Sequence, residues 1–250
     1  MPVIIDLNWP APANIRAFVT CRKGGSSAFP YDSLNLADHV GDDVQSVIAN
    51  RSQLQNTIGG TVTIHWLNQV HGVDVVEAGY NSNIIQADAQ MTARQGAALA
   101  VLTADCLPVL FCDISGTKIA AAHAGWRGLA GGILDNTLTA MDVEPSQVLA
   151  WLGPAISARH FEVGAEVRLA FLDAVDSNRF NATNQCFKAV KNNPEQYMAD
   201  LYALAKERLK YLGVTKVYGG DFCTWEQSDR FYSYRRDGVT GRMASIICLV

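Results

Sequence analysis

Three residues with metal-binding side chains, His71, Cys106 and His123, each stand at the end of an apolar run in the sequence. Each run has the composition of a strand, so we expect each of these side chains to emerge where a strand meets a loop. Imidazole nitrogens and a thiolate are good zinc ligands, and three protein ligands leave a fourth position for water or substrate. The set therefore indicates a catalytic metal site rather than a structural one.

The segment His123-Ala124-Gly125-Trp126-Arg127-Gly128 falls where a strand is expected to turn into a helix. Glycines relieve crowding at such a junction, and the backbone amides of a helix N-terminus can face an anion. We expect His123 to point to the metal and Arg127 to point to substrate or to a neighbouring carboxylate. Trp126 fits either core packing or a platform for a planar ligand.

The same residues also fit a different chemistry. A cysteine near two histidines is typical of a nucleophile activated by an imidazole base. A thiolate bound to zinc is poorly available for attack, so the two interpretations of Cys106 compete, and the sequence does not separate them. Asp88 and Asp105 are both candidates for a proton acceptor or for a carboxylate that orients a ligand imidazole.

A second group of residues is basic or glycine-rich and fits an anion. Glycine amides can approach a phosphate closely, and arginine binds phosphate or carboxylate through two hydrogen bonds. A surface turn with solvated charges is the structural alternative. The candidate phosphate-binding and substrate-binding residues are Arg22, Gly24, Gly25, Asn35, Arg127, Arg235 and Arg236.

The hydrophobic pattern predicts more strands than helices, and the two do not alternate strictly. This favours an α+β or mixed α/β layered domain over a doubly wound parallel fold. We expect one domain over residues 1–250. Strands are predicted over 15–21, 61–67, 73–78, 97–103, 107–114, 117–124, 147–153, 215–220 and 242–250, and helices over 44–58, 128–142, 164–175 and 193–213.

Composition narrows the class of protein. The chain has 250 residues, of which 49% are hydrophobic, and a net charge of -4. That charge argues against a nucleic-acid partner, whose binding needs a basic excess. The N-terminal residues lack a signal-peptide pattern, no apolar tract is long enough to span a membrane, and the six cysteines are scattered. We expect a cytoplasmic protein with reduced thiols.

Four segments taken together resemble one known family: Asn68–Gly72 ("NQVHG"), Thr103–Phe111 ("TADCLPVLF"), the segment from His123 to Gly128, and the stretch 231–245 around "FYSYRRD" and "TGRMAS". The chain resembles the bacterial laccase-domain (YfiH-type) proteins, described as polyphenol oxidases and as purine nucleoside phosphorylases. The resemblance runs nearly end to end.

The resemblance implies a layered α/β/β/α single domain related to cysteine-hydrolase-like proteins. It implies that His71, Cys106 and His123 are the metal ligands, with zinc as the metal and copper as the alternative, and it places the family's anion-binding arginine at Arg22. The family's usual threonine before this arginine is replaced here by Cys21. A four-copper oxidase needs many histidines, and the chain has five, which argues against it.

The leading hypothesis is a zinc-dependent purine nucleoside phosphorylase that converts adenosine, inosine or methylthioadenosine to free base and ribose 1-phosphate, with an adenosine deaminase side activity. The alternatives are a copper-linked polyphenol oxidase, a cysteine hydrolase that edits peptidoglycan precursors, and a non-catalytic metal-containing binding module. The expected partners are a purine nucleoside and phosphate, with no nucleic acid or membrane. We expect a monomer or a small homo-oligomer.

Overall fold

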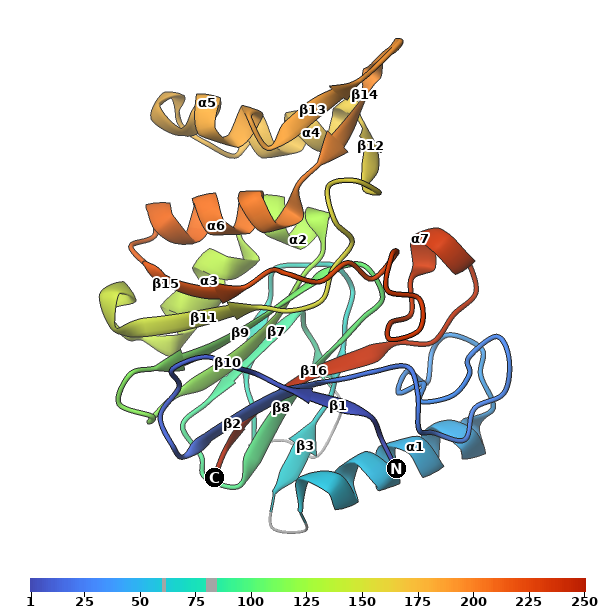
Figure 1. Ribbon diagram of the computed structural model, residues 1–250. Helices are drawn as coiled ribbons and strands as arrows, with labels where there is room; N and C mark the ends of the chain where they lie inside the picture. Colours follow the sequence, from blue (N-terminus) through green and yellow to red (C-terminus); the bar gives the residue numbers. More distant parts are fainter. Residues whose placement is uncertain (60–61, 80–84) are drawn as a thin grey trace.

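The computed structural model describes residues 1–59, 62–79 and 85–250, and its centre is a pair of stacked sheets (Figure 1). The first sheet is antiparallel except where β3 runs parallel to β8. Its five strands, in spatial order, are β1 Ile4–Asp6, β2 Ile15–Thr20, β16 Met243–Leu249, β8 Ala97–Thr103 and β3 Thr63–His65. Because the chain returns to this sheet at both ends, its first and last long strands pair with each other.

The second sheet carries the apolar strands that end near the candidate metal ligands. β9 and β10 are antiparallel neighbours, with His123 opposite Pro108 and Ala124 opposite Leu107. The residues of both strands are buried along their whole length, as expected of strands covered on both faces. In spatial order the six strands are β15 Lys216–Gly219, β11 Val148–Leu152, β9 Leu107–Asp113, β10 Ile119–Ala124, β7 Ala89–Thr92 and β5 Val75–Glu77.

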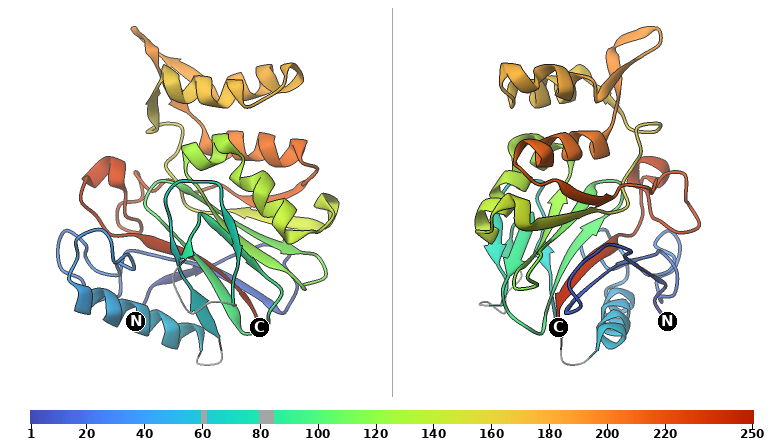
Figure 2. Two further views of the ribbon diagram at one scale, coloured as in Figure 1. Left: turned by 180° about the vertical axis from the view of Figure 1, so that it is seen from behind. Right: turned by 60° about the vertical axis from the view of Figure 1, so that its left-hand side comes forward.

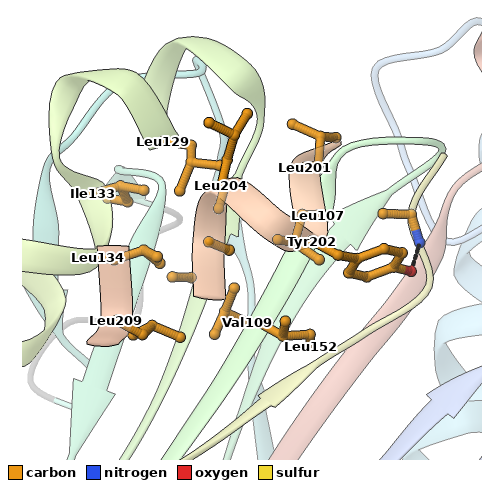
Figure 3. Packing of buried hydrophobic residues seen from close by; sticks show 14 of the residues in the cluster. Leu107, Val109, Leu129, Ile133, Leu134, Leu152, Leu201, Tyr202, Leu204 and Leu209 are labelled. Carbon is orange, nitrogen blue, oxygen red and sulfur yellow. Dashed lines mark hydrogen bonds between the residues drawn. The ribbon is translucent and has the colours of Figure 1, made fainter. Parts of the chain in front are cut away.

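The two sheets bury apolar side chains between them and against helices. Figure 2 shows these helices on the outer faces of the two sheets. Val19, Leu99 and Ile247 of the first sheet share one cluster with Leu110 and Leu149 of the second. Helix α1 Val44–Ile58 packs on the outer face of the first sheet. Helices α2 Trp126–Gly131, α3 Ile133–Met141 and α6 Leu201–Tyr211 cover the second sheet, where side chains such as Leu129 and Leu204 pack over Leu107 and Val109 (Figure 3).

The remaining elements lie outside these layers. Residues 162–199 form a three-stranded sheet with two helices, which extends beyond α6 at the top of Figure 1. These elements are β12 Glu162–Gly164, α4 Ala165–Asp173, α5 Ser177–Asn184, β13 Phe187–Val190 and β14 Asn193–Ala199. The short elements are β4 Leu67–Asn68, β6 Ile85–Gln86, the 3-10 helix Pro145–Gln147 and α7 Tyr234–Asp237.

The mixed α/β class is confirmed, as are helices over 44–58 and in the 164–175 segment. The helix predicted over 128–142 is two helices, because Gly132 has a left-handed φ of 96° between α2 and α3. The strand predicted over 61–67 begins at a residue outside the described ranges, and its described part contains β3 and the first residue of β4.

The helix predicted over 193–213 is wrong in its first half. Residues Asn193–Ala199 form β14, which pairs with both β12 and β13. Pairing with two strands outweighs a helical hydrophobic pattern, because local propensity is a weak preference. The helix starts only after Asp200, whose carboxylate accepts the amide of Ala203 at 3.0 Å as an N-cap.

The longest apolar tract of the sequence, residues 96–112, forms β8 and most of β9. In the part of the chain that the structure describes, no helix combines the length and the apolar character needed to cross a bilayer.

Candidate functional site

The structure brings His71, Cys106 and His123 together at one end of the second sheet. His71 lies in the loop after β4, Cys106 directly precedes β9, and His123 lies near the end of β10. Their ligand atoms all lie within 4.8 Å of one another, and Cys106 Sγ is 3.8 Å from His71 Nε2. The two imidazole rings meet edge to face, with centroids 4.7 Å apart. Antiparallel pairing of β9 and β10 explains why Cys106 and His123 share this position.

Asp88, just before β7, holds both histidines in place. Its Oδ1 lies 2.7 Å from His123 Nδ1 and accepts the amide of His71 at 2.9 Å. Its Oδ2 accepts the amides of Val70 and Gly72 at 3.1 and 2.6 Å. These bonds fix a loop in which His71 has a φ of 62°, and they leave Nε2 of His123 for a metal or a proton. Of Asp88 and Asp105, Asp88 is therefore the carboxylate that contacts a candidate ligand imidazole.

Gly125 leaves the space in which the three side chains meet. A Cβ atom at this position would lie 3.1 Å from Cys106 Sγ, 3.1 Å from His71 Cδ2 and 3.5 Å from His123 Cε1. The φ of Gly125 is -59°, which any residue adopts, so the close approach rather than the backbone requires glycine. This small space between two imidazoles and a sulfur fits a zinc or copper ion.

Cys106 and His123 influence each other's protonation strongly. Burial alone would raise the pKa of Cys106, but the charge and hydrogen bonds of His123 and His71 lower it to about 6. Burial alone would lower the pKa of His123, but the Cys106 thiolate and the bond to Asp88 raise it to about 9. Cys106 is therefore a thiolate at neutral pH, which is the form that binds metals and attacks electrophiles.

Asp105 connects the cluster to two residues near the C-terminus, Thr224 and Arg235. Its Oδ1 accepts the hydroxyl of Thr224 at 2.5 Å, and its Oδ2 accepts the amide of Arg235 at 2.7 Å. The residue is buried and has a φ of 98°, a conformation that these hydrogen bonds stabilise. Asp105 thus fixes the backbone beside Cys106.

A cavity of about 390 Å³ opens beside the cluster. Sequence reasoning missed several of its residues, among them Gln69, which bonds the backbone of Leu102, and Arg242, whose amide donates to Asn35 at 3.0 Å. Gln69 lies within the motif "NQVHG" and Arg242 within "TGRMAS", so membership of these motifs was the available signal. The lining residues are His39, Gln69, His71, Leu102, Thr103, Ala104, Cys106, His123, Tyr234 and Arg242.

This cavity is not lined by the predicted anion-binding residues Arg22, Gly24, Gly25 and Asn35. The amides of Gly24 and Gly25 donate to Ser33 Oγ at 3.0 and 3.1 Å, so they have an acceptor inside the chain. Arg22 bonds the carbonyls of Asp32 and Ser228 and packs over the ring of Tyr232. Asn35 is buried, and its side chain bonds Ala37, Asp42 and the amide of Arg242. These contacts stabilise the loop and position Arg242.

The other predicted arginines also lie away from the cavity lining. Arg127 is exposed and lies over Trp126, with its guanidinium 4.4 Å from the ring centroid. Arg235 bonds the carbonyl of Glu162 at 2.7 Å. Arg236 donates to the carbonyls of Thr224, Trp225 and Phe231 and pairs with Asp237, which occupies its donors.

The fold and the cluster define a mixed α/β protein with a His–Cys–His site at the edge of a sheet and a cavity beside it. The chain belongs to the family described as multi-copper polyphenol oxidoreductase laccase, whose model matches residues 16–250. The resemblance identified from the motifs is thereby confirmed.

Similar proteins cover the chain almost completely. A Pseudomonas aeruginosa protein named purine nucleoside phosphorylase is 51% identical, over 97% of this chain and 96% of its own. The Escherichia coli purine nucleoside phosphorylase YfiH is 47% identical over the full length of both chains. Among solved structures, the Neisseria meningitidis protein NMB0706 is 49% identical with a TM-score of 0.93, covering 98% of both chains.

Proposed function

We propose that this protein is a metal-dependent purine nucleoside phosphorylase whose reaction takes place in the cavity beside His71, Cys106 and His123. The observation that carries the proposal is this three-ligand cluster at the wall of a cavity, in a chain about half of whose residues are shared with relatives of that name. The proposed substrates are inosine, adenosine and methylthioadenosine, and the proposed metal is zinc.

Phosphorolysis forms a bond between a phosphate oxygen and C1′ of the ribose and breaks the bond from C1′ to the purine nitrogen. The bonding electrons leave with the purine, which takes up a proton. Because the sugar passes through a cation-like state, an enzyme gains most by holding phosphate and nucleoside in line. A cavity of about 390 Å³ is of a size that suits a small-molecule ligand.

Arg242 is the cation that we propose to hold the phosphate, because it lines the cavity. Its backbone is fixed by Asn35, and its guanidinium donates to the carbonyls of Thr240 and Gly241. A phosphate role for Arg22, Gly24, Gly25, Arg127, Arg235 and Arg236 stays a prediction, and it requires that their present contacts rearrange.

His71, Cys106 and His123 would hold the metal, which would supply Lewis-acid chemistry toward a substrate group. Asp88 would keep His123 in the tautomer that presents Nε2. The expected adenosine deaminase side activity, in which water replaces an amino group of the purine, would use the same cavity. Copper-linked oxidation of phenols rests on the name of the family alone.

A cysteine hydrolase is the second candidate, and one observation favours it. Without a metal, Cys106 is a thiolate next to His71 and His123, and His123 is bonded to Asp88. This order of thiolate, imidazole and carboxylate occurs in enzymes that attack acyl carbons. Editing of peptidoglycan precursors is the corresponding proposal for its substrate.

The test compares metal-loaded protein with protein treated with a chelator, using inosine and phosphate as substrates. We expect hypoxanthine release with zinc, loss of release after chelation, and return of release on adding zinc back. His123→Ala should bind no metal at this site and release no base. Cys186 directly precedes β13, away from the site, so the control variant Cys186→Ser should behave as wild type. Turnover that survives both chelation and His123→Ala would overturn the proposal, and turnover of no nucleoside by loaded protein would favour a binding module.

The proposal extends to the domain organisation, location and oligomeric state of the protein. We propose a single domain over residues 1–250 with a relation to cysteine-hydrolase-like folds, a cytoplasmic location, and a monomer or small homo-oligomer without nucleic-acid or membrane partners.

A further inference from the structure

A second group of metal-binding side chains lies outside the cavity of the candidate active site. His160, Cys223 and Glu226 place one ligand atom each within 4.8 Å of the others. His160 precedes β12, and the two other residues follow β15. The segments are joined by a bridge between Ala155 and Cys223 and by a hydrogen bond of 3.0 Å from the amide of Thr224 to the carbonyl of Ala155.

The side chains of this cluster are held before any metal binds. The ring of His160 stacks on Trp225, with centroids 3.9 Å apart and planes 10° apart. His160 Nε2 lies 2.8 Å from Glu226 Oε1, while Glu226 Oε2 lies 2.7 Å from Arg159 Nη2. One carboxylate oxygen thus faces His160, and the other is oriented by an arginine. Such outer contacts are typical of residues that position metal ligands.

The loop that carries Cys223 is also held by a hydrogen bond to Asp105. Its neighbour Thr224 is fully buried and donates to Asp105 at 2.5 Å. Cys223 is 4% exposed and is one of the residues that line a cavity of about 460 Å³, together with Arg159 and Glu226. The cavity gives room for a fourth ligand beside Cys223 and Glu226, which are two of the three side chains.

Two polar atoms of residues that line this cavity have no hydrogen-bond partner among the described residues. Ser157 Oγ and Gln227 Oε1 are buried, and each belongs to a residue that lines the cavity. Buried polar atoms without partners are uncommon and call for a ligand, a water or an ion nearby. They mark the cavity beside Cys223 as a place where a polar ligand would be favourable.

We propose that His160, Cys223 and Glu226 form a second metal site, for Zn²⁺ or a similar borderline-soft divalent ion. The ion would enter between His160 and Glu226 Oε1, take Cys223 Sγ as its third ligand and keep a fourth position open to the cavity. Binding releases the thiol proton of Cys223 to solvent, because only the thiolate is a ligand. Arg159 keeps its bond to Glu226 Oε2. The proposal does not depend on the reaction at the first site.

The experiment uses Co²⁺ as a spectroscopic probe in the full-length Cys106→Ser variant, which removes the thiolate of the first site. A cobalt–thiolate bond gives a charge-transfer absorption in the near ultraviolet. We expect Cys106→Ser to show this absorption on titration with Co²⁺, and the double variant Cys106→Ser/Cys223→Ser to lose it. Cys106→Ser/Cys186→Ser is the matched control and should keep the absorption.

A further variant separates ligand loss from misfolding. Glu226→Gln in the Cys106→Ser background changes an exposed side chain, so the fold should persist, and the apparent Kd for Co²⁺ should rise by about tenfold or more. Zinc content after dialysis should fall from about two equivalents per wild-type chain to about one in Cys223→Ser. Absence of the absorption in Cys106→Ser, or its persistence without Cys223, would overturn the proposal.

Discussion

Asp88 lies 2.7 Å from His123 Nδ1, and the same carboxylate accepts the amides of three consecutive residues, Val70, His71 and Gly72. One fully buried side chain therefore sets both the orientation of one imidazole and the backbone that carries the other. The hydrogen bonds from His123 and these amides lower the pKa of Asp88 against the opposing effect of burial. The carboxylate is thus ionised, and its role is to position the two histidines.

Asp88→Asn tests this positioning role. The amide group of Asn would direct a donor toward groups that are themselves donors, so we expect zinc affinity to fall about 10–100-fold. The free energy of unfolding should fall by about 1–3 kcal/mol, because backbone amides lose their acceptor. Zinc titration and urea unfolding measure the two effects. Glu77→Gln, on an exposed position of β5, is the control, and equal affinities in the two variants would contradict the role.

Gly125→Ala tests the space between the three ligands. The added methyl group would contact Cys106 Sγ and His71 Cδ2 at 3.1 Å, which is tighter than ordinary packing. We expect zinc affinity to fall by about tenfold or more, with helix α2 retained because Gly125 is its N-cap, contributes no side-chain cap and has a φ of -59° that alanine also adopts. Competition with a chromophoric chelator measures the affinity, and circular dichroism measures the helix. Wild-type affinity in this variant would show that the metal lies elsewhere.

The protonation of Cys106 is tested by alkylation in metal-free protein. Since its pKa is lowered to about 6, the rate of reaction with iodoacetamide should rise through pH 6 and level off by pH 8. Burial raises the pKa of Cys112 and of Cys248 to about 12, so these thiols should stay unlabelled in this range. Peptide mapping locates the label, and zinc should protect Cys106. A rate that rises only near pH 9 would contradict the ion pair with His123.

Asp113 provides a test of stability that is independent of the site. Its carboxylate accepts the amides of Thr117 and Lys118 at 2.7 and 2.8 Å in the turn between β9 and β10. Burial opposes ionisation, but these bonds and the Thr117 hydroxyl lower the pKa of Asp113. A lowered pKa stabilises the fold above the ordinary value near 4 and stops doing so as pH falls through the folded-state value.

Asp113→Asn should therefore lower the free energy of unfolding by about 1–3 kcal/mol at pH 7. The difference from wild type should shrink as pH falls below about 4, where Asp113 is protonated first in the unfolded chain and then, at its lowered pKa, in the folded one. Urea unfolding at several pH values measures the difference, with the exposed Asp173→Asn as control. A difference that does not change with pH would show that shape rather than charge matters.

The strands of this protein and the positions of the candidate ligands at their ends were predictable from the sequence, because both depend on local patterns. Apolar runs long enough to be buried on both faces predicted β8, β9 and β10, and each ligand stands where such a run ends. The family motifs added the connection among His71, Cys106 and His123.

The environment of the ligands was not predictable in the same way, because it depends on contacts between distant segments. Backbone carbonyls of residues elsewhere in the chain accept hydrogen bonds from Arg22, Arg235 and Arg236. No local sequence pattern predicts these contacts. The same holds for Arg242, whose place at the cavity depends on Asn35. Strand β14 was mistaken for a helix because its pairing partners β12 and β13 are set by tertiary structure.

The measurement that tests the central claim most directly is the product balance of inosine with zinc-loaded protein, followed by chromatography with and without phosphate. The proposal predicts equal amounts of hypoxanthine and ribose 1-phosphate, formed only when phosphate is present. Release of hypoxanthine with free ribose, at a rate independent of phosphate, would contradict a phosphorylase and assign the cavity beside His71, Cys106 and His123 to hydrolysis.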